Sequence, residues 1–442
     1  MPKPYVRIAD SIARRIATGD LPIGAQLPPQ RRFAYEHGIA VSTASRVYDE
    51  LRRRGLISGE VGRGTYVASR FAPLDPALQE PAGTGIDLEI VFRLGGPARE
   101  VISQSTARFF KAGLPGRAAA PASVRADAAT AAVLAGLTRV ADHRPPPETL
   151  LLAGSGKEAI AATFAALAPR GGRIAVEALT YPFAISAARL LGIDLVPLPV
   201  DDEGIEPAAL EAQARQGLAG VYLQPTHQSP LVLTMSEGRR AAIADLLARH
   251  DLTAVEDSVY GFLKPMQPLA AYAPDQVIRI DSLSKRLMPG LALGLIEAPA
   301  SFHERLAKAL RTGGWMAPSL AVALARHWIE DGVVTAVEAT KRQEAAAMFE
   351  IAGRSFAGLE VRAEPDALHC WLSLPEGWRG ESFAAASAEL GIAVAPGQAF
   401  AVASGTAPSG VRIAFSAPDL ETWEFALSEL ASIATRGPEK DL

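Results

Sequence analysis

The stretch "IRIDSLSKRLMPGLALG", residues 278–294, places Lys285 directly after an apolar strand and before a Pro-Gly turn. Ile278 and Ile280 alternate with polar residues, a pattern that predicts a strand. Strands of a parallel sheet are usually buried, whereas lysine keeps its ammonium group in water. Lys285 is therefore either an incidental turn lysine or a residue with a chemical role.

The length and the amino-acid composition indicate the class of protein. A chain of 442 residues predicts two or three domains, and 49% hydrophobic with 21% charged residues is typical of a soluble globular protein. No stretch approaches the ~18 consecutive apolar residues of a membrane span, and the first residues lack the apolar centre of a secretory signal. The single cysteine, Cys370, excludes an intrachain disulfide, and the seven histidines show no metal-ligand spacing. We expect a cytoplasmic protein with no membrane partner and no metal site.

The charge is unevenly distributed along the chain. Residues 1–70 hold 12 Lys and Arg against 6 Asp and Glu, whereas residues 71–442 hold 32 against 42. A basic N-terminal part on an acidic body indicates that nucleic acid is bound at one end only.

The first seventy residues show the pattern of a small DNA-binding domain. Ile8, Ile12 and Ile16 form one apolar stripe on a helix, and further helices are expected over 31–36 and 42–54. "LISGEVGRGTYVA", residues 56–68, predicts two short strands around a Gly-Arg-Gly tip. Three helices followed by a basic hairpin are typical of a winged helix-turn-helix, which we place at residues 1–70.

Several residues of this domain are candidate DNA contacts, since the N-terminal end of the third helix would enter the major groove. They are Ser42, Thr43 and Arg46 on the third helix, Arg63 at the wing tip, and Arg31 and Arg32 on the second helix. An ordinary solvated face is the alternative interpretation. The order of motifs from "GAQLPPQRRF" to "GRGTYVA" resembles the N-terminal domain of the GntR regulators and favours DNA binding. At the start of the third helix Ala40 and Val41 stand where many relatives carry Ser-Arg, so the base preference does not follow from the resemblance.

A second, larger region follows a tether. Residues 71–85 contain three prolines and two glycines with no apolar period, which is typical of a linker. In residues 86–435, runs such as "RIAVEA", "GVYLQP", "TAVED" and "VIRIDS" alternate with helical stretches. This alternation predicts an α/β domain with a mostly parallel sheet covered on both faces. The strands "LHCWLSLP" and "GVRIAFSAP" and a closing helix at 419–435 predict a small C-terminal α+β domain.

Polar side chains follow neighbouring strands of the predicted sheet. Asp257 and Tyr260 come after one strand, and Ser282, Ser284 and Lys285 come at the end of the next. Because the carboxyl ends of parallel strands meet at one edge, we expect these residues to lie close together. A lysine amine can form a Schiff base with an aldehyde, and an aspartate can pair with the protonated pyridine nitrogen of pyridoxal 5'-phosphate (PLP).

A possible phosphate site lies in "LLLAGSGKEAIAATFAAL", residues 150–167. Ser155, Gly156 and Lys157 stand at the start of a helix, where backbone amides can bind phosphate. The turn is not a nucleotide P-loop, because Leu151 replaces the first glycine and Glu158 stands where Ser or Thr should follow the lysine.

The motifs "SLSK…PG" and "EDSVY" give residues 86–435 a resemblance to fold-type I aminotransferases, and the whole chain resembles the MocR subfamily of GntR regulators. The resemblance implies that Lys285 forms an aldimine with PLP, that Asp257 faces the pyridine nitrogen, and that Tyr260 lies at the 3-hydroxyl. It further implies ring stacking by Tyr181, phosphate contacts from Ser155, Gly156, Lys157, Ser282 and Ser284, and a carboxylate contact for a substrate or effector from Arg412. A core aromatic, a helix cap and a strand arginine are the alternatives for Tyr181, Asp257 and Arg412.

Two departures from the family pattern bear on the cofactor. Ala292 stands where the family usually has an arginine that binds phosphate, and Ser229 replaces the asparagine of "NPTG" near the 3-hydroxyl. A missing charge-assisted hydrogen bond is worth roughly 1.5–3 kcal/mol. Arg286 or Lys157 could compensate for the loss, and otherwise PLP binding is weak and reversible.

The leading hypothesis is a homodimeric transcription regulator that binds operator DNA and senses PLP, or an amino compound, through a PLP aldimine. One alternative is an active aminotransferase with an accessory DNA-binding module, and another is a DNA-binding dimer whose aminotransferase-like body holds no cofactor. Ala292 and Ser229 argue against the enzyme, for which we expect at most slow half-transamination. Lys285, Asp257 and Tyr260 argue against the cofactor-free scaffold.

Overall fold

The computed structural model describes residues 4–18, 21, 25–53, 56–60, 64–67, 85–92, 94–403 and 405–437. The chain divides into two compact units, one of residues 1–80 with 403–408 and one of residues 81–402 with 409–442. Each unit is described by itself. No described helix is long and apolar enough to cross a membrane.

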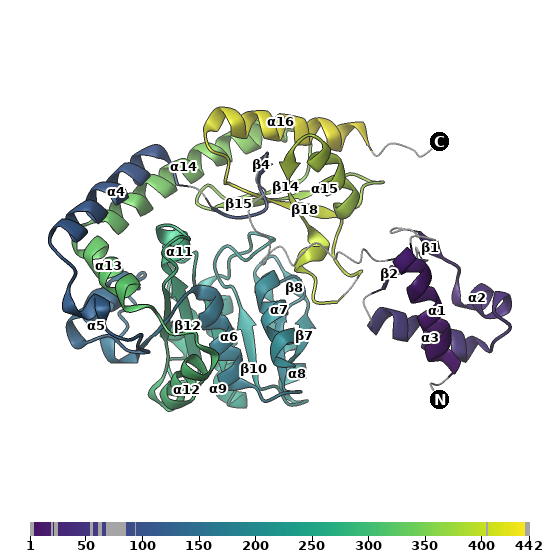
Figure 1. Cartoon of the computed structure of the whole chain (residues 1–442), viewed down its shortest axis with the longest axis horizontal. Coiled ribbons are helices and arrows are strands. Elements are labelled where there is room, and N and C mark those ends of the chain that lie inside the picture. The colour runs from purple at the N-terminus through teal and green to yellow at the C-terminus, as the bar shows by residue number, and fades with distance from the viewer. Residues whose placement is uncertain are drawn as a thin grey trace. The chain divides into compact units, whose positions relative to one another are not determined.

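The described residues of the small unit form three helices and a three-stranded sheet (Figure 1). The helices are α1 (Pro4–Thr18), α2 (Gln30–Glu36) and α3 (Val41–Arg53), and the strands β1 (Gln26–Leu27), β2 (Ile57–Glu60) and β3 (Gly64–Val67) lie in the order β1-β3-β2. The core is built from residues that recur at helical spacing and are buried: Ala9, Ile12, Ile16, Ala44, Val47 and Leu51. The winged helix-turn-helix prediction is confirmed.

The large unit is built on a seven-stranded sheet in the order β5-β13-β12-β11-β10-β6-β7. These strands are β5 (Leu150–Ala153), β6 (Arg173–Glu177), β7 (Asp194–Leu198), β10 (Gly220–Leu223), β11 (Ala254–Asp257), β12 (Val277–Ser282) and β13 (Gly294–Glu297). All neighbours pair in parallel except β13, which is antiparallel to both β12 and β5. The sheet is therefore mostly parallel, as the alternating pattern predicted.

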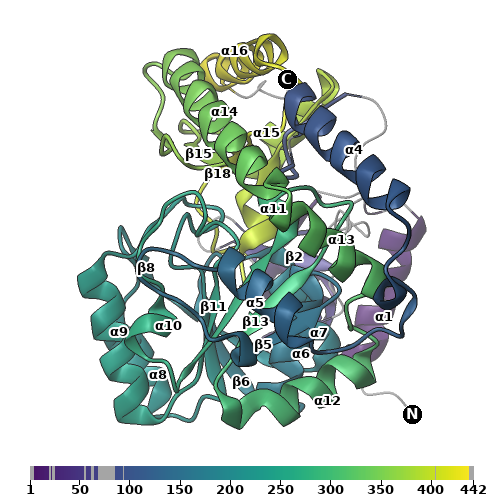
Figure 2. The ribbon, with the colours of Figure 1, turned by 90° about the vertical axis from the view of Figure 1, so that its left-hand side faces the viewer.

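Helices cover both faces of this sheet, as Figure 2 shows. On one face the strands share a core with α6 (Gly156–Leu167), α7 (Pro182–Leu191) and α12 (His303–Gly313). On the other they pack against α8 (Pro207–Ala214), α9 (Glu237–His250) and α10 (Leu269–Tyr272). Because both faces are buried, most strand residues are apolar, as in β5 and β10, and polar side chains such as Asp257 and Ser282 stand at the strand ends.

The remaining elements of the large unit form two groups. At one side α4 (Gly96–Lys111), α5 (Ala128–Leu137) and α13 (Ser319–Glu330) share a core. Towards the C-terminus, β14 (Val361–Arg362), β15 (His369–Ser373), β18 (Gly410–Ala414) and β17 (Ala395–Pro396) form a sheet that packs with α14 (Val333–Ser355), α15 (Gly380–Glu389) and α16 (Leu420–Arg436). A parallel pair of β4 (Ile86–Asp87) and β16 (Ile392–Ala393) ties the start of the unit to its end.

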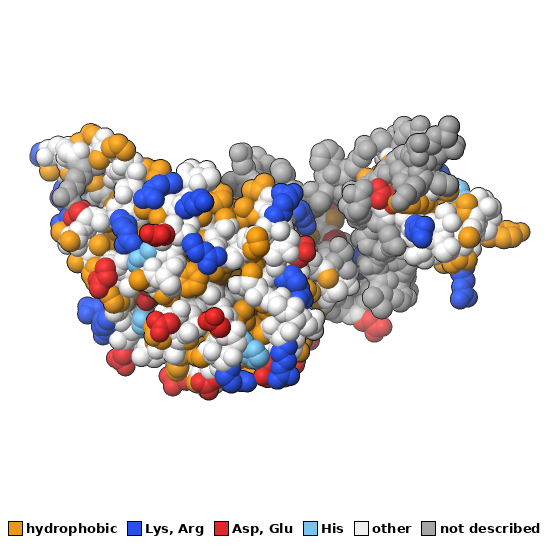
Figure 3. Space-filling view, turned by 90° about the horizontal axis from the view of Figure 1, so that it is seen from below, with side chains coloured by type: hydrophobic (Ala, Val, Ile, Leu, Met, Phe, Trp, Pro, Cys, Tyr) orange, Lys and Arg blue, Asp and Glu red, His pale blue; other side chains and the backbone are white. Residues whose placement is uncertain are grey.

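One face of the large unit is mixed in charge. On the face drawn in Figure 3, basic and acidic side chains are interspersed among apolar ones.

Candidate functional site

The ends of β10, β11 and β12 bring the central side chains of the site together. Asp257 closes β11 and is buried, and the Tyr222 hydroxyl donates a 2.6 Å hydrogen bond to its Oδ2. Burial raises the pKa of Asp257 to about 6, against the lowering effect of this hydrogen bond. Tyr222 was not predicted. It lies one strand away, on β10, where only the parallel register places it beside Asp257.

Lys285 lies on α11 (Leu283–Arg286), a short helix that directly follows β12. The Ser282 hydroxyl caps this helix by accepting a hydrogen bond of 3.1 Å from the Ser284 amide. The Lys285 Nζ donates a 2.8 Å hydrogen bond to the carbonyl of Val91. Burial, followed by repulsion from Arg412 and other cations, lowers the pKa of Lys285 to about 7. A large fraction of this amine is therefore neutral at physiological pH, as a nucleophile requires.

The start of α6 lies against the start of α11. Ser155 caps α6, its hydroxyl accepting from the Glu158 amide at 3.1 Å. A Cβ on Gly156 would lie 3.1 Å from the Cβ of Ser282, so glycine permits this close approach. The hydroxyls of Ser282 and Ser284 are 3.1 Å apart. Two capped helix starts and three hydroxyls thus meet at one place, a donor set suited to a phosphate group.

Lys157 is exposed on the first turn of α6, and its ammonium lies 5.6 Å from the centre of the Phe183 ring. Tyr181 precedes α7 and is half-buried, with its ring 6.2 Å from that of Phe183.

Arg412 on β18 reaches the site from the C-terminal sheet. It is buried, and its Nη1 donates to the Ser229 hydroxyl at 2.9 Å while Nη2 donates to the carbonyl of Glu89. Its guanidinium carbon lies 4.7 Å from the centre of the Phe400 ring. Its Nε is buried without a hydrogen-bond partner among the described residues. Burial lowers the pKa of Arg412 from its usual range, and a carboxylate ligand would complete its hydrogen bonding.

Tyr260 is buried three residues beyond Asp257, and its ring lies 5.7 Å from that of His369 on β15. Burial raises the pKa of Tyr260 to about 12. Burial, together with the nearby Arg412, holds the pKa of His369 well below its usual range, so this imidazole is uncharged.

Arg286 is engaged inside the protein. Its Nε and Nη2 donate to Asp281, with Nη2 at 2.6 Å, and its Nη1 donates to Glu338 at 2.6 Å. All three guanidinium nitrogens thus have carboxylate partners. A phosphate contact from Arg286 was an expectation from sequence, whereas the contacts in the structure connect α11 to α14.

Lys341 and Glu177 are site residues that the sequence reasoning missed. The Lys341 Nζ donates a 2.7 Å hydrogen bond to the carbonyl of Lys285, and burial lowers the pKa of Lys341 to about 8. Its signal was available: Lys341 stands on the apolar stripe of α14, between Val337 and Ala345. Glu177 at the end of β6 is buried, accepts the Gln224 amide at 2.8 Å, and has its pKa raised to about 7 by burial.

His227 lies between two carboxylates at the edge of the site. Its ring is fully buried, with Nδ1 3.7 Å from Glu364 and Nε2 3.3 Å from Asp366. One potential ligand atom from each of these three residues lies within 4.8 Å of the others. Lys264 also pairs with Glu364, so a cation already competes for that carboxylate. Sequence spacing could not reveal this cluster, since its members come from two distant loops.

The predicted DNA contacts lie on the small unit. Arg31 and Arg32 are exposed on α2, where Arg32 also pairs with Glu36 at 2.7 Å. On α3 Ser42 and Arg46 are exposed and Thr43 is half-buried. Arg63 lies outside the described residues.

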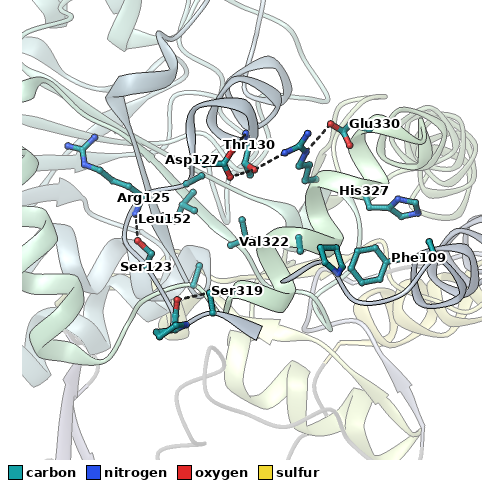
Figure 4. A pocket seen from close by; sticks show the side chains of 18 of the residues that line it. Phe109, Ser123, Arg125, Asp127, Thr130, Leu152, Ser319, Val322, His327 and Glu330 are labelled. Atoms are coloured by element: carbon teal, nitrogen blue, oxygen red, sulfur yellow. Dashed lines mark hydrogen bonds and ion pairs between the residues drawn. The ribbon is translucent and has the colours of Figure 1, made fainter. Parts of the chain in front are cut away.

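A separate cavity of about 570 Å³ lies between the end of α4, the start of α5 and α13. Figure 4 shows Asp127, Thr130 and Glu330 among the lining residues. The Thr130 hydroxyl donates to Asp127 at 2.7 Å, and Arg326 donates to Thr130 at 3.2 Å and to Glu330 at 2.9 Å. Apolar side chains, Leu152 and Val322 among them, line the cavity together with Ser123 and Ser319.

Known proteins resemble the chain in both units. The family "Bacterial regulatory proteins, gntR family" matches residues 4–67, and "Aminotransferase class I and II" matches residues 125–430. YdeF of Bacillus subtilis (strain 168), an uncharacterized HTH-type transcriptional regulator, is 30% identical over 94% of this chain and 90% of that protein. The chain belongs to the MocR subfamily of GntR transcription regulators.

This MocR regulator has further relatives of both kinds. PtsJ of Salmonella typhimurium, a "Vitamin B6 salvage pathway transcriptional repressor", is 27% identical over 92% of this chain and 93% of that protein. An archaeal alanine:glyoxylate aminotransferase matches with a TM-score of 0.73 and 21% identity, covering 82% of this chain and 93% of that one. LysN, the α-aminoadipate aminotransferase of Thermus thermophilus, matches with a TM-score of 0.70 and 22% identity, covering 79% and 91%. The fold-type I prediction is confirmed.

PLP is the cofactor that this aminotransferase fold implies, and the site of the MocR regulator fits it. An amine with a lowered pKa, Lys285, shares the strand ends with the buried carboxylate of Asp257. The hydroxyls and helix starts at Ser155 and Ser282 suit a phosphate, and Arg412 holds an unpartnered buried Nε in the part of the chain that the structure describes.

Proposed function

We propose that this MocR protein is a cytoplasmic transcription regulator that binds operator DNA and responds to PLP, or to an amino compound that PLP binds. The observation that carries the proposal is the arrangement of Lys285, on the helix that follows β12 with its amine 2.8 Å from the Val91 carbonyl, and the buried Asp257 carboxylate at the end of β11. Burial also lowers the pKa of Lys285 to about 7. When bound, PLP supplies an aldehyde that reacts with amines and a pyridine ring that accepts electrons. The printed name of PtsJ, a vitamin B6 salvage repressor, supports a PLP-linked regulator.

The chain's own residues would divide the work of holding PLP. Lys285 provides the amine, and Asp257 holds a negative charge for the pyridine nitrogen while Tyr222 orients its carboxylate. We assign Tyr260 and Ser229 to the 3-hydroxyl and Tyr181 to the ring. The phosphate would rest on Ser155, Gly156, Ser282 and Ser284, with Lys157 at the rim.

The hold on the phosphate is weaker than in a family member with an arginine at the position of Ala292. Arg286 does not stand free to replace that arginine, because Asp281 and Glu338 engage it. The loss of one charge-assisted hydrogen bond, roughly 1.5–3 kcal/mol, weakens affinity by about ten- to a hundredfold. Affinity reduced in this way favours a sensor that exchanges PLP with the cell over an enzyme that retains it.

Arg412 is the group we assign to the carboxylate of an amino compound. Its present partners, the Ser229 hydroxyl and the Glu89 carbonyl, are neutral, so a carboxylate would gain a charged partner there.

We assign the contact between two copies of the chain to the region of the 570 Å³ cavity in Figure 4. Phe110, Leu114 and Leu320 are 50%, 59% and 41% exposed and are each next in sequence to a residue that lines it. Large exposed apolar side chains around an apolar hollow favour a protein partner. A homodimer would also pair two winged domains for paired half-sites on DNA.

The deciding experiment measures binding to operator DNA with and without PLP, beside a screen for amino-acid turnover. We expect PLP to change DNA affinity about five- to 150-fold, the usual range of allosteric coupling, with little transamination. The same titration on Lys285→Ala should show no response to PLP, whereas Lys308→Ala, an exposed lysine on α12, should respond like the parent. Brisk multiple turnover together with DNA affinity indifferent to PLP would replace the regulator with an aminotransferase.

A further inference from the structure

In a second cavity, of about 420 Å³, four of the five charged lining residues are arginines. It lies between residues 137–144, residues 261–265, α11 and α14. Its charged lining consists of Arg139, Arg144, Arg286, Arg342 and Glu338. None of these residues belongs to the set proposed above to hold PLP.

The positive charge of this cavity is only partly neutralised. Arg286 is fully paired with Asp281 and Glu338. Arg342 reaches the same Glu338 at 3.4 Å and otherwise donates to the Phe262 carbonyl at 2.7 Å. One carboxylate therefore serves two guanidinium groups.

The other two arginines have no acidic partner among the described residues. Arg144 donates only to the carbonyls of Ala141 and His143, at 2.7 and 3.1 Å. Arg139 is exposed and makes no hydrogen bond or ion pair with a described residue. The body of the chain is acidic, with 42 Asp and Glu against 32 Lys and Arg in residues 71–442, so an arginine cluster there stands out. A ligand of opposite charge explains it better than solvation alone.

We infer that this cavity is a binding site for a small oxyanion, a phosphate or a carboxylate group, distinct from the cofactor site. The planar guanidinium fork binds either group through two parallel hydrogen bonds. Arg139 and Arg144 provide the free donors, and Arg342 provides a third when Glu338 turns fully to Arg286. A volume of about 420 Å³ accommodates a metabolite that carries such a group.

The site is connected to Lys285 through α11 and α14. Arg286 follows Lys285 on α11, and Arg342 follows Lys341 on α14. Lys341 holds the Lys285 carbonyl while Glu338 holds Arg286, so an anion that draws Arg342 away from Glu338 changes the contact that positions α11. This step rests on the proposed function. If the site holds PLP, binding of an anion in the cavity changes the affinity for PLP.

The test uses the full chain saturated with PLP, so that the phosphate site at Ser155 is filled. Isothermal titration with inorganic phosphate and, separately, with citrate should show one saturable site for at least one of them. Arg139→Gln should weaken that binding about tenfold or more, since one charge-assisted hydrogen bond is lost. Because Arg139 is exposed and bonds to no described residue, its replacement removes no internal interaction. Arg311→Gln, an exposed arginine on α12, is the matched control and should bind like the parent.

The outcomes separate this inference from the proposed function. Equal affinity in the parent and in Arg139→Gln, or no saturable binding of either anion, would overturn it. If the protein takes up no PLP, the same titration and the same Arg139→Gln comparison still decide whether the cavity binds anions. In PLP titrations, the anion should shift the Kd of PLP in the parent but not in Arg139→Gln. An equal shift in both would overturn the connection and place the anion at the cofactor site.

Discussion

At the residue scale, the surroundings of the Lys285 amine determine its protonation. Lys285 loses proton affinity because burial penalises its charge and because Arg412, Lys341 and Lys157 are also positive. Asp257 opposes this effect but does not cancel it. The ammonium form dominates below pH 7 and the neutral, nucleophilic form dominates above it.

The rate of PLP uptake should therefore rise with pH around a midpoint near 7, far below the usual lysine range near 10.4. The neutral amine attacks the aldehyde, so the rate falls as the amine becomes protonated at lower pH. Stopped-flow absorption of the apo-protein with PLP from pH 5.5 to 9 measures the midpoint. A rate that keeps rising to pH 9 without a plateau would refute the lowered pKa.

Replacing Lys341 should move that midpoint. Lys341→Met removes a positive charge that lowers the pKa of Lys285, so the midpoint should shift to higher pH. Methionine fits the apolar stripe of α14 and keeps the volume of the side chain. Lys308→Met on α12 is the exposed control and should leave the midpoint in place. An unchanged midpoint in Lys341→Met would mean that Lys341 only positions the Lys285 backbone.

At the element scale, α3 shows how one helix serves two purposes. Its inner face, with Ala44, Val47 and Leu51 fully buried, holds the small unit together. Tyr48 joins that face, and its hydroxyl donates to the Pro28 carbonyl at 2.5 Å, which ties α3 to the segment before α2. The outer face is left to polar and basic residues.

Arg46→Ala on α3 and Arg32→Ala on α2 should therefore differ in effect. We assign Arg46 to base edges, so its loss should weaken specific binding by about 1–3 kcal/mol and binding to random DNA much less. We assign Arg32 to phosphate, so its loss should weaken binding to both kinds of DNA about equally and reduce the salt dependence. Fluorescence anisotropy with operator and scrambled duplexes at several salt concentrations measures both. Equal losses on the two duplexes for Arg46→Ala would assign it to phosphate.

At the scale of the whole molecule, the two units can communicate only if PLP favours one arrangement of them. Linkage then requires operator DNA to change PLP affinity by the same factor by which PLP changes DNA affinity. Titration of PLP in the presence of saturating operator DNA, followed by absorption, checks this equality. A DNA effect on PLP affinity that differs from the reciprocal effect would show that the two measurements report different oligomers.

The proposed dimer contact gives a second prediction at this scale. Phe110→Asp combined with Leu114→Asp should shift the protein from dimer to monomer in analytical ultracentrifugation, because charges replace buried apolar area. Leu190→Asp is the control, since Leu190 is 77% exposed on α7, away from the cavity. If dimers persist in the double variant, the dimer contact lies elsewhere on the chain.

The order of residues was enough to predict the architecture and to propose most of the site. The predictions used local patterns: the helical spacing of isoleucines, the alternation of strands and helices, and a lysine after a strand. Such patterns can be read directly from the sequence. Asp257 and Lys285 were found because parallel strands bring their carboxyl ends to one edge. Ser155 was found because it stands at a glycine turn that starts a helix. The roles of the individual residues and the exact domain limits remain predictions.

Contacts between distant residues could be known only from the folded chain. Tyr222 meets Asp257 through the register of two strands, and Lys341 reaches Lys285 because α14 packs on α11. The cluster around His227 and the arginine-lined cavity likewise join segments far apart in the chain. Burial and neighbouring charge, which set the pKa of Lys285, depend on those contacts and therefore have no signature in the order of residues.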